Sequence, residues 1–208
     1  MNYGISSRDY LSRAQERLLE GKLESLFYAA FELRCGIESR MQEYLDAQEF
    51  VSKKKKKGWQ IAKLGKDIEQ VFKIGDKVAE FTVIEKETGN IIDIFYYTPV
   101  TSKLRKMAEK LGELLHATKK SRKDDDKWWH DIRKYLKEVY QELTKANVGT
   151  LLGVPLIRKD TGQLYMNIEI LKGEDPNSIK NRVGQIGTQR ILKVRYLDEL
   201  PPNAMNTK

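Results

Sequence analysis

The chain has 208 residues, with 38 lysines and arginines against 30 aspartates and glutamates and a formal net charge of +8. Hydrophobic residues make up 40% and charged residues 33%, which excludes a wholly disordered or collagen-like chain. No apolar run reaches the roughly 18 residues of a membrane span, and the first ten residues lack the apolar segment of a secretion signal. We therefore expect a soluble cytoplasmic protein that does not associate with membranes.

The composition also limits metal and disulfide chemistry. Cys35 is the single cysteine, and His116 and His130 are the two histidines. These three side chains cannot supply the four ligands of a Cys/His zinc site, and one cysteine cannot form an internal disulfide. Phosphate-binding glycine-rich loops and metalloprotease motifs are missing as well. We expect no metal and no cofactor.

Positive charge is distributed unevenly. Residues 1–50 hold 6 basic and 9 acidic side chains, a balance of −3, which leaves +11 for the remainder. Most of the excess falls in three segments, 53–67, 101–123 and 177–196. A single basic run is usually a solvated stretch, but three basic segments beside an acidic one indicate a polarised surface of the kind that binds nucleic acid.

The first fifty residues predict two helices. Ser6 or Ser7 can cap a helix over about 7–20, and Gly21 stands where a helix commonly stops. Residues 23–50 carry an apolar stripe at helical spacing, formed by Leu26, Ala30, Leu33, Ile37, Met41 and Tyr44. The first half of this segment is also apolar on its opposite side, where Tyr28, Phe31 and Cys35 lie. We therefore expect it to be the enclosed central helix of a bundle.

The middle of the chain predicts a basic link, a hairpin and three further helices. The lysine run predicts a solvated link over 52–58, followed by a short helix over about 59–73. Two β-rich runs with Gly89 between them predict a hairpin over 78–97. Apolar residues at helical spacing predict helices over 102–117 and 124–146, the latter begun by three aspartates that favour a helix N-terminus.

A second hairpin is predicted over 154–171, with a turn sequence similar to that of the first. Two hairpins that pair into one antiparallel sheet, covered by a helical bundle, give an α+β fold. We expect one domain over 1–200 and a disordered tail over 201–208, where prolines follow the last apolar segment.

Residues 31–38, Phe-Glu-Leu-Arg-Cys-Gly-Ile-Glu, resemble a core helix of HEPN-like proteins, small helical bundles of bacterial toxin–antitoxin and phage-defence systems. Active members of that family use an arginine followed by a nearby histidine as a metal-free ribonuclease site. In this chain the corresponding residues after Arg34 are Ser39, Arg40 and Met41, and none of them is a histidine. The resemblance therefore implies a catalytic role for Arg34 only if His116 or His130 is delivered from another helix. The structural alternative for Arg34 is an ion pair with Glu38, one turn away.

Three functions remain open at this point. The main prediction is binding of RNA or single-stranded DNA through phosphates on a basic face, in the setting of phage defence. The alternatives are a metal-independent endoribonuclease and a non-catalytic module whose acidic N-terminal helices dock on a protein partner. Whether the protein is an enzyme stays open, as does its oligomeric state, a dimer included. The residues that we expect to contact phosphates are Lys53, Lys54, Lys55, Lys56, Lys57, Arg105, Lys106, Lys119, Lys120, Arg122, Lys123, Arg182, Arg190 and Arg195.

Overall fold

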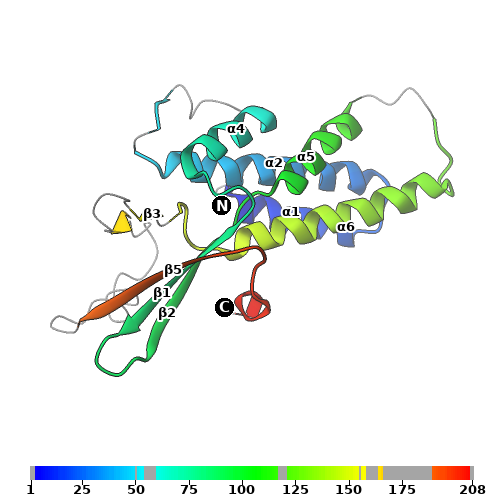
Figure 1. Cartoon of the computed structure of the whole chain (residues 1–208). Coiled ribbons are helices and arrows are strands. Elements are labelled where there is room, and N and C mark those ends of the chain that lie inside the picture. Colours follow the sequence, from blue (N-terminus) through cyan, green and yellow to red (C-terminus); the bar gives the residue numbers. More distant parts are fainter. Residues whose placement is uncertain are drawn as a thin grey trace.

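The computed structural model describes residues 3–49, 51–53, 60–116, 121–154, 156–157, 164–165 and 189–206. Its elements are α1 (Ser7–Leu19), α2 (Glu24–Asp46), α4 (Ile61–Phe72), β1 (Val78–Glu85), β2 (Ile91–Tyr97), α5 (Ser102–Leu115), α6 (Lys127–Val148), β3 (Leu156–Ile157), β4 (Leu164–Tyr165), β5 (Arg190–Leu197) and the 3-10 helix η1 (Pro202–Asn206). The helices α1, α2, α4, α5 and α6 lie together as a bundle, and β1, β2 and β5 extend from one end of it (Figure 1). The predicted α+β fold class is confirmed.

Side-chain caps explain where the helices begin. Ser6 accepts from the amide of Asp9 while the Asp9 carboxylate accepts from the amide of Ser6, which forms a complete capping box at α1. Thr101 caps α5 and Asp126 caps α6 in the same way, each by accepting a backbone N–H of the first turn. Gly21 follows α1 with a φ of 76°, which glycine adopts without strain. The five helices of the described residues occupy the predicted segments, with ends that differ by a few residues.

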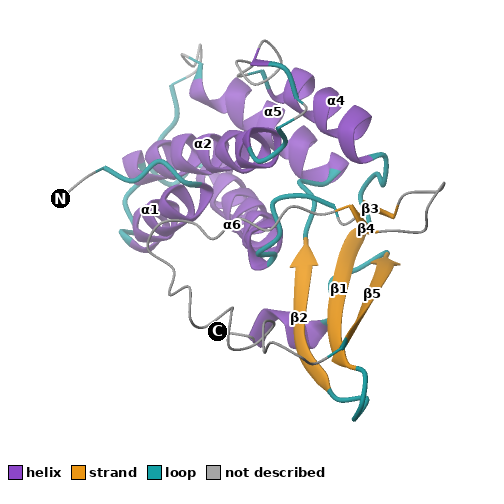
Figure 2. Ribbon diagram, turned by 90° about the vertical axis from the view of Figure 1, so that its left-hand side faces the viewer, coloured by secondary structure: helices purple, strands orange, loops and turns teal. Residues whose placement is uncertain are grey.

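The bundle core is organised around α2, which packs against α1, α4, α5 and α6. Leu33, Ile37 and Met41 of its predicted stripe are fully buried. The prediction that α2 is enclosed on all sides is wrong, because Tyr28 and Phe31 remain 59% and 49% exposed. The helices α1, α4, α5 and α6 lie around α2 (Figure 2), and the exposed rings of Tyr28 and Phe31 lie on the part of α2 that they leave in solvent.

The sheet differs from the predicted pairing of two hairpins. β1 lies in the centre of a three-stranded antiparallel sheet of order β2-β1-β5, and β3 pairs with β4 in a sheet of their own. The first hairpin is as predicted. The third strand, β5, lies mainly in the basic segment 177–196, for which no strand was predicted. β5 mixes apolar residues with Arg190, Lys193 and Arg195 and is exposed over most of its length, which suits a strand at the sheet edge. The rest of the predicted hairpin over 154–171 lies outside the described residues.

The predicted disorder after residue 200 is also corrected. Residues 202–206 form η1, and Ala204 is only 3% exposed because it packs with Val78 and Tyr96 at the base of the sheet. Val148, at the end of α6, joins the same small cluster. This cluster fixes the end of the chain between the sheet and α6, which explains why the proline-containing segment is ordered. Residues 207–208 lie outside the described part.

Candidate nucleic-acid interface

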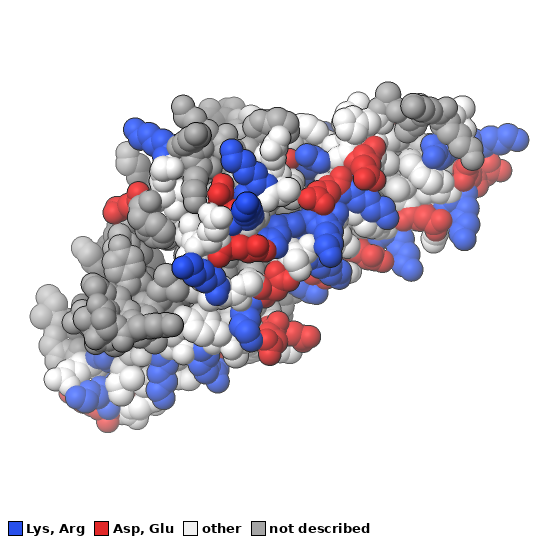
Figure 3. All heavy atoms as spheres, turned by 45° about the horizontal axis from the view of Figure 1, so that its top comes forward, with Lys and Arg blue, Asp and Glu red and all other residues white. Residues whose placement is uncertain are grey.

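The part of the chain that the structure describes is electrically balanced. It holds 26 lysines and arginines and 26 aspartates and glutamates. The whole excess of +8 therefore comes from residues outside it, mainly Lys54–Lys57, Lys119 and Lys120. Basic and acidic side chains are interspersed over the helices on the face that Figure 3 shows. The expected excess of positive charge therefore does not come from the described elements taken together.

Two of the predicted phosphate-binding arginines hold β5 to β1. Arg195 places Nη2 2.6 Å from Oε1 of Glu80, whose side chain is only 4% exposed. Arg190 places Nη1 3.1 Å from Oε1 of Glu85. The buried carboxylate of Glu80 needs a cation nearby, so Arg195 is part of the sheet, and Arg190 pairs with the less buried Glu85 across the same two strands. Arg195 keeps 66% of its side chain exposed and can still face solvent, whereas Arg190 is largely covered. Arg182 lies outside the described residues.

Arg105 joins α5 to α4. Its Nη1 donates to the carbonyl oxygen of Gly65 at 3.3 Å, and its guanidinium pairs with Glu69. A Cβ at Gly65 would come within 2.6 Å of Arg105 Cδ, so the glycine allows this close approach. Arg105 is therefore a helix-packing residue, whereas Lys106 and Lys53 are exposed to solvent.

The connection between α5 and α6 brings basic and aromatic side chains together. The Cζ atom of Arg122 lies 4.0 Å from the ring centroid of Trp128. Trp129 donates its indole N–H to the carbonyl oxygen of Lys123 at 2.9 Å, which fixes the backbone just before α6. The Lys123 side chain is exposed. Lys119 and Lys120 precede this site in the sequence but lie outside the described residues.

Two of the described basic candidates, Arg122 and Arg195, lie near opposite ends of α6. α6 has 22 residues, and at a rise of about 1.5 Å per residue its ends are roughly 33 Å apart. Arg122 contacts Trp128 at its beginning, whereas Val148 at its end packs beside the sheet that carries Arg195. Among the described residues, the predicted set does not form one continuous basic face.

The structure places the predicted catalytic arginine between two helices. Arg34 Nε lies 3.2 Å from Oε1 of Glu38, which is the predicted ion pair, and its Nη1 donates to the carbonyl oxygen of Ala108 at 3.3 Å. A Cβ at Gly112 would be 2.0 Å from Arg34 Nη1, so the guanidinium lies directly against α5. His116 follows one turn later and is exposed, as is His130 on α6. No described hydrogen bond joins Arg34 to either histidine.

The acid–base properties of the neighbouring groups do not suggest a nucleophile. Burial, followed by the nearby Glu38 and Glu32 carboxylates, raises the pKa of the Cys35 thiol to about 11. Burial also raises the pKa of Glu38, although the adjacent Arg34 opposes this effect. Cys35 therefore stays protonated near neutral pH and is a poor nucleophile. In the described part of the chain, no group of three or more metal-binding side chains comes together.

Arg40 is a buried charged residue that the sequence pattern did not predict. Its guanidinium donates to the carbonyl oxygens of Ala146 at 3.0 Å and Gly149 at 2.7 Å, and it pairs with Glu43 at 2.8 Å. It also donates to the hydroxyl of Tyr44 at 2.9 Å, which in turn donates to the carbonyl of Thr98. Arg40 thus satisfies the last carbonyls of α6 and links the bundle to the end of β2. Its spacing of three residues from Ile37 and four from Tyr44 placed a charge within the buried stripe, which could have revealed it.

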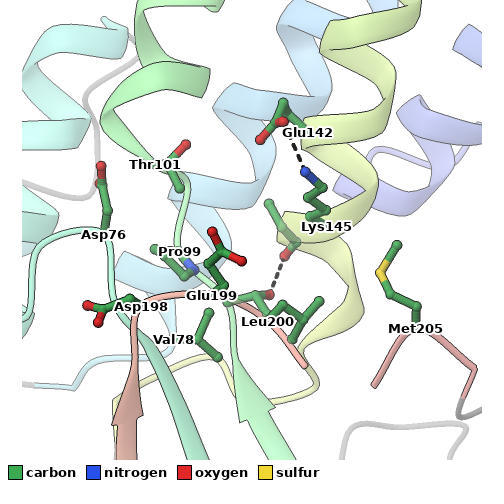
Figure 4. A pocket seen from close by; sticks show the side chains of 12 residues that line it. Asp76, Val78, Pro99, Thr101, Glu142, Lys145, Asp198, Glu199, Leu200 and Met205 are labelled. Atoms are coloured by element: carbon green, nitrogen blue, oxygen red, sulfur yellow. Dashed lines mark hydrogen bonds and ion pairs between the residues drawn. The ribbon is translucent and has the colours of Figure 1, made fainter. Parts of the chain in front are cut away.

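A pocket of about 390 Å³ lies where α5, α6 and the sheet meet. Its lining contains four carboxylates and one lysine (Figure 4), namely Asp76, Glu142, Asp198, Glu199 and Lys145. Burial alone would raise the pKa of Glu142, but hydrogen bonds from Lys103 and Lys145 lower it overall. The pocket is therefore acidic and unsuited to a phosphate.

Comparison of the chain with protein families, characterised proteins and solved structures finds no match. Among the described residues, no helix has both the length and the apolar character that a membrane crossing requires.

Proposed function

We propose that this protein binds RNA or single-stranded DNA through phosphates, with Lys53–Lys57 and the segment 119–123 as the principal contacts. The observation that carries the proposal is that the described elements are neutral while the chain carries +8. The lysines that supply this excess are not needed to balance acids within the described fold. A run of lysines without adjacent acids, such as Lys53–Lys57, is the electrostatic signature of a phosphate-binding chain.

Three arginines of the predicted set have structural partners, whereas the described lysines of the set are exposed. Arg105, Arg190 and Arg195 each pair with a glutamate of a neighbouring element. They serve the fold, whereas the exposed Lys53, Lys106 and Lys123 remain suited to phosphates. The resemblance of residues 31–38 to HEPN-like proteins supports a role in the bacterial cytoplasm and in phage defence.

A titration against a mixed-sequence single strand at several salt concentrations, in EDTA, tests this proposal. Affinity should fall steeply with salt, because each lysine that meets a phosphate releases a counterion. The triple variant K54Q/K55Q/K56Q should lower the slope of log affinity against log salt by about 2, at roughly 0.7 per lysine. The matched control K22Q/K134Q/K137Q removes three exposed lysines of the bundle and should keep the slope. A salt-independent affinity, or equal effects of both triples, would contradict the proposal.

A metal-independent endoribonuclease is the second candidate. It is favoured by the contact of Arg34 with α5 at Ala108 and Gly112, because His116 continues the same line of the helix one turn later. Cleavage of RNA in EDTA should then disappear in Arg34→Ala and in His116→Ala, while binding persists. Cleavage that survives both changes would reject this assignment.

A protein partner at the acidic N-terminal helices is the third candidate. It is favoured by the exposed aromatic rings of Tyr28 and Phe31, since neighbouring exposed aromatics are common at protein interfaces. Phe31→Ser should then abolish co-purification of a defined partner without changing the melting temperature. Unchanged co-purification would argue against this surface.

A further inference from the structure

The beginning of α6 carries an aromatic cluster at the end of the bundle opposite to the sheet (Figure 1). The rings of Trp128 and Trp129 meet edge to face at 4.8 Å, and Phe27 of α2 lies 6.4 Å and 5.9 Å from them. Trp129 packs against the bundle core and is anchored by its hydrogen bond to Lys123. Trp128 is partly exposed and does not belong to the core cluster.

Trp128 is contacted by several neighbouring groups although it is partly exposed. The side chain of Asp126 accepts the backbone N–H of Trp128 at 2.9 Å and so fixes the first turn of α6. Trp129 and Phe27 support the ring from the bundle side. Arg122 covers it with its guanidinium at 4.0 Å. A cation–π contact at such a site is weaker than the stacking of a nucleobase on an aromatic ring.

We propose that an unpaired base of the bound strand stacks on the face of Trp128 that Arg122 covers, while Arg122 turns to the adjacent phosphate. This inference rests on the proposed function and narrows its substrate to single strands. A base exposes its π-face to a protein side chain only when it is not stacked within a duplex. The guanidinium keeps a favourable partner in both states, an indole ring without nucleic acid and a phosphate with it.

Nearby acids restrict the path of the strand. Asp124 and Asp125 are exposed at the turn before α6, and a phosphate beside them would be repelled. The exposed Lys123 and Lys127 flank them and attract the strand. The proposed subsite therefore accommodates one base on Trp128 with its phosphate on the Arg122 side, and not a long run of phosphates along the turn.

The experiment measures binding of a fluorescent oligothymidine, an oligouridine and a duplex of the same length to the full chain. Trp128→Leu should weaken binding of both single strands by roughly 10- to 100-fold, the range for losing one stacked base. Binding of the duplex and the salt slope should stay as they are. Trp128→Phe, which keeps an aromatic ring, should recover most of the loss, and Phe31→Leu, which removes an exposed ring of α2, should have no effect.

Arg122→Ala tests whether Arg122 leaves the Trp128 ring to contact a phosphate or only covers the ring. If Arg122 contacts a phosphate, this variant should lower the slope of log affinity against log salt by about 0.7, the value for one phosphate contact. It should keep its preference for single strands. Loss of that preference in Arg122→Ala would overturn the exchange.

Single-strand binding that is unchanged in Trp128→Leu, or an equal loss for duplex, would overturn the stacking subsite. Salt-dependent binding would then still support the proposed function. Absence of salt-dependent binding by the unmodified chain would overturn both proposals.

Discussion

Two arginines of this molecule lie over aromatic rings, and their surroundings give them opposite roles. Arg40 Cζ lies 4.7 Å from the ring of Tyr44, and Arg122 Cζ lies 4.0 Å from the ring of Trp128. Arg40 is 3% exposed and donates to two carbonyl oxygens at the end of α6 as well as to Glu43. Arg122 is partly exposed, at the other end of that helix. An arginine over an aromatic ring thus stabilises the fold where the pair is buried, at Arg40 and Tyr44. Where the pair meets solvent, at Arg122 and Trp128, we propose that a ligand replaces the arginine on the ring.

The largest expected effect comes from removing the buried arginine. Arg40→Ala would leave Glu43 and the carbonyls of Ala146 and Gly149 without their donor, so unfolding should become easier by about 3–5 kcal/mol. Thermal or denaturant unfolding measures this loss. Arg122→Ala is the matched control and should change stability by less than about 1 kcal/mol. Equal losses of stability in Arg40→Ala and Arg122→Ala would show that the two arginines contribute equally to the fold.

A third arginine tests whether partial exposure alone decides the role. Arg195 is exposed on one side, but its partner Glu80 is buried, so Arg195→Met should destabilise the sheet by about 1–3 kcal/mol. Lys193→Met, two residues away on the same strand and exposed, should stay within about 0.5 kcal/mol. Denaturant unfolding compares the two. Equal stability of both variants would mean that Glu80 does not require its ion pair.

The stability of the region where α5, α6 and the sheet meet should depend on pH in the acidic range. The pKa of Glu142 is lower in the folded chain than its ordinary value because the hydrogen bonds from Lys103 and Lys145 outweigh burial. Its contribution to stability is therefore present above the unfolded pKa of about 4.3 and is lost as the pH falls through the lower folded value. Glu142→Gln should flatten the stability curve in that acidic range. An unchanged curve would exclude Glu142 as a source of the dependence.

The smallest expected effect concerns the Trp128 end. Asp124→Asn and Asp125→Asn remove exposed negative charge beside the proposed subsite, so each should tighten single-strand binding by about two-fold at low salt. The gain should vanish at high salt because these charges are screened. Anisotropy titrations at both salt concentrations measure it. Asp131→Asn, an exposed acid within α6, provides a comparison of equal charge.

Local signals predicted most of the bundle. Helical spacing of apolar residues, the cap at Ser6 and the glycine after α1 act over a few residues, so all five helices could be placed. The hairpin over 78–97 was found for the same reason, since Gly89 adopts a φ of 74° in its turn. Such features depend on neighbours in the sequence and need no knowledge of the tertiary fold.

Long-range pairing explains what the sequence analysis missed. β5 joins the sheet through contacts such as that between Arg195 and Glu80, which are 115 residues apart. The partners of Arg40 likewise lie more than a hundred residues away, at Ala146 and Gly149. A basic strand and a basic loop have similar composition, and Arg34 and Arg40 occupy the same predicted helix. Only the tertiary contacts distinguish an arginine that holds the fold from one that faces solvent.

The neutrality of the described elements has a practical consequence for the isoelectric point. The sequence value of about 9.3 reflects a few lysine segments, chiefly Lys54–Lys57 with Lys119 and Lys120. Replacing these six lysines by glutamine would lower the formal net charge to +2 without altering a residue of the described helices or strands. Retention on a cation exchanger and the melting temperature should therefore vary independently in this protein.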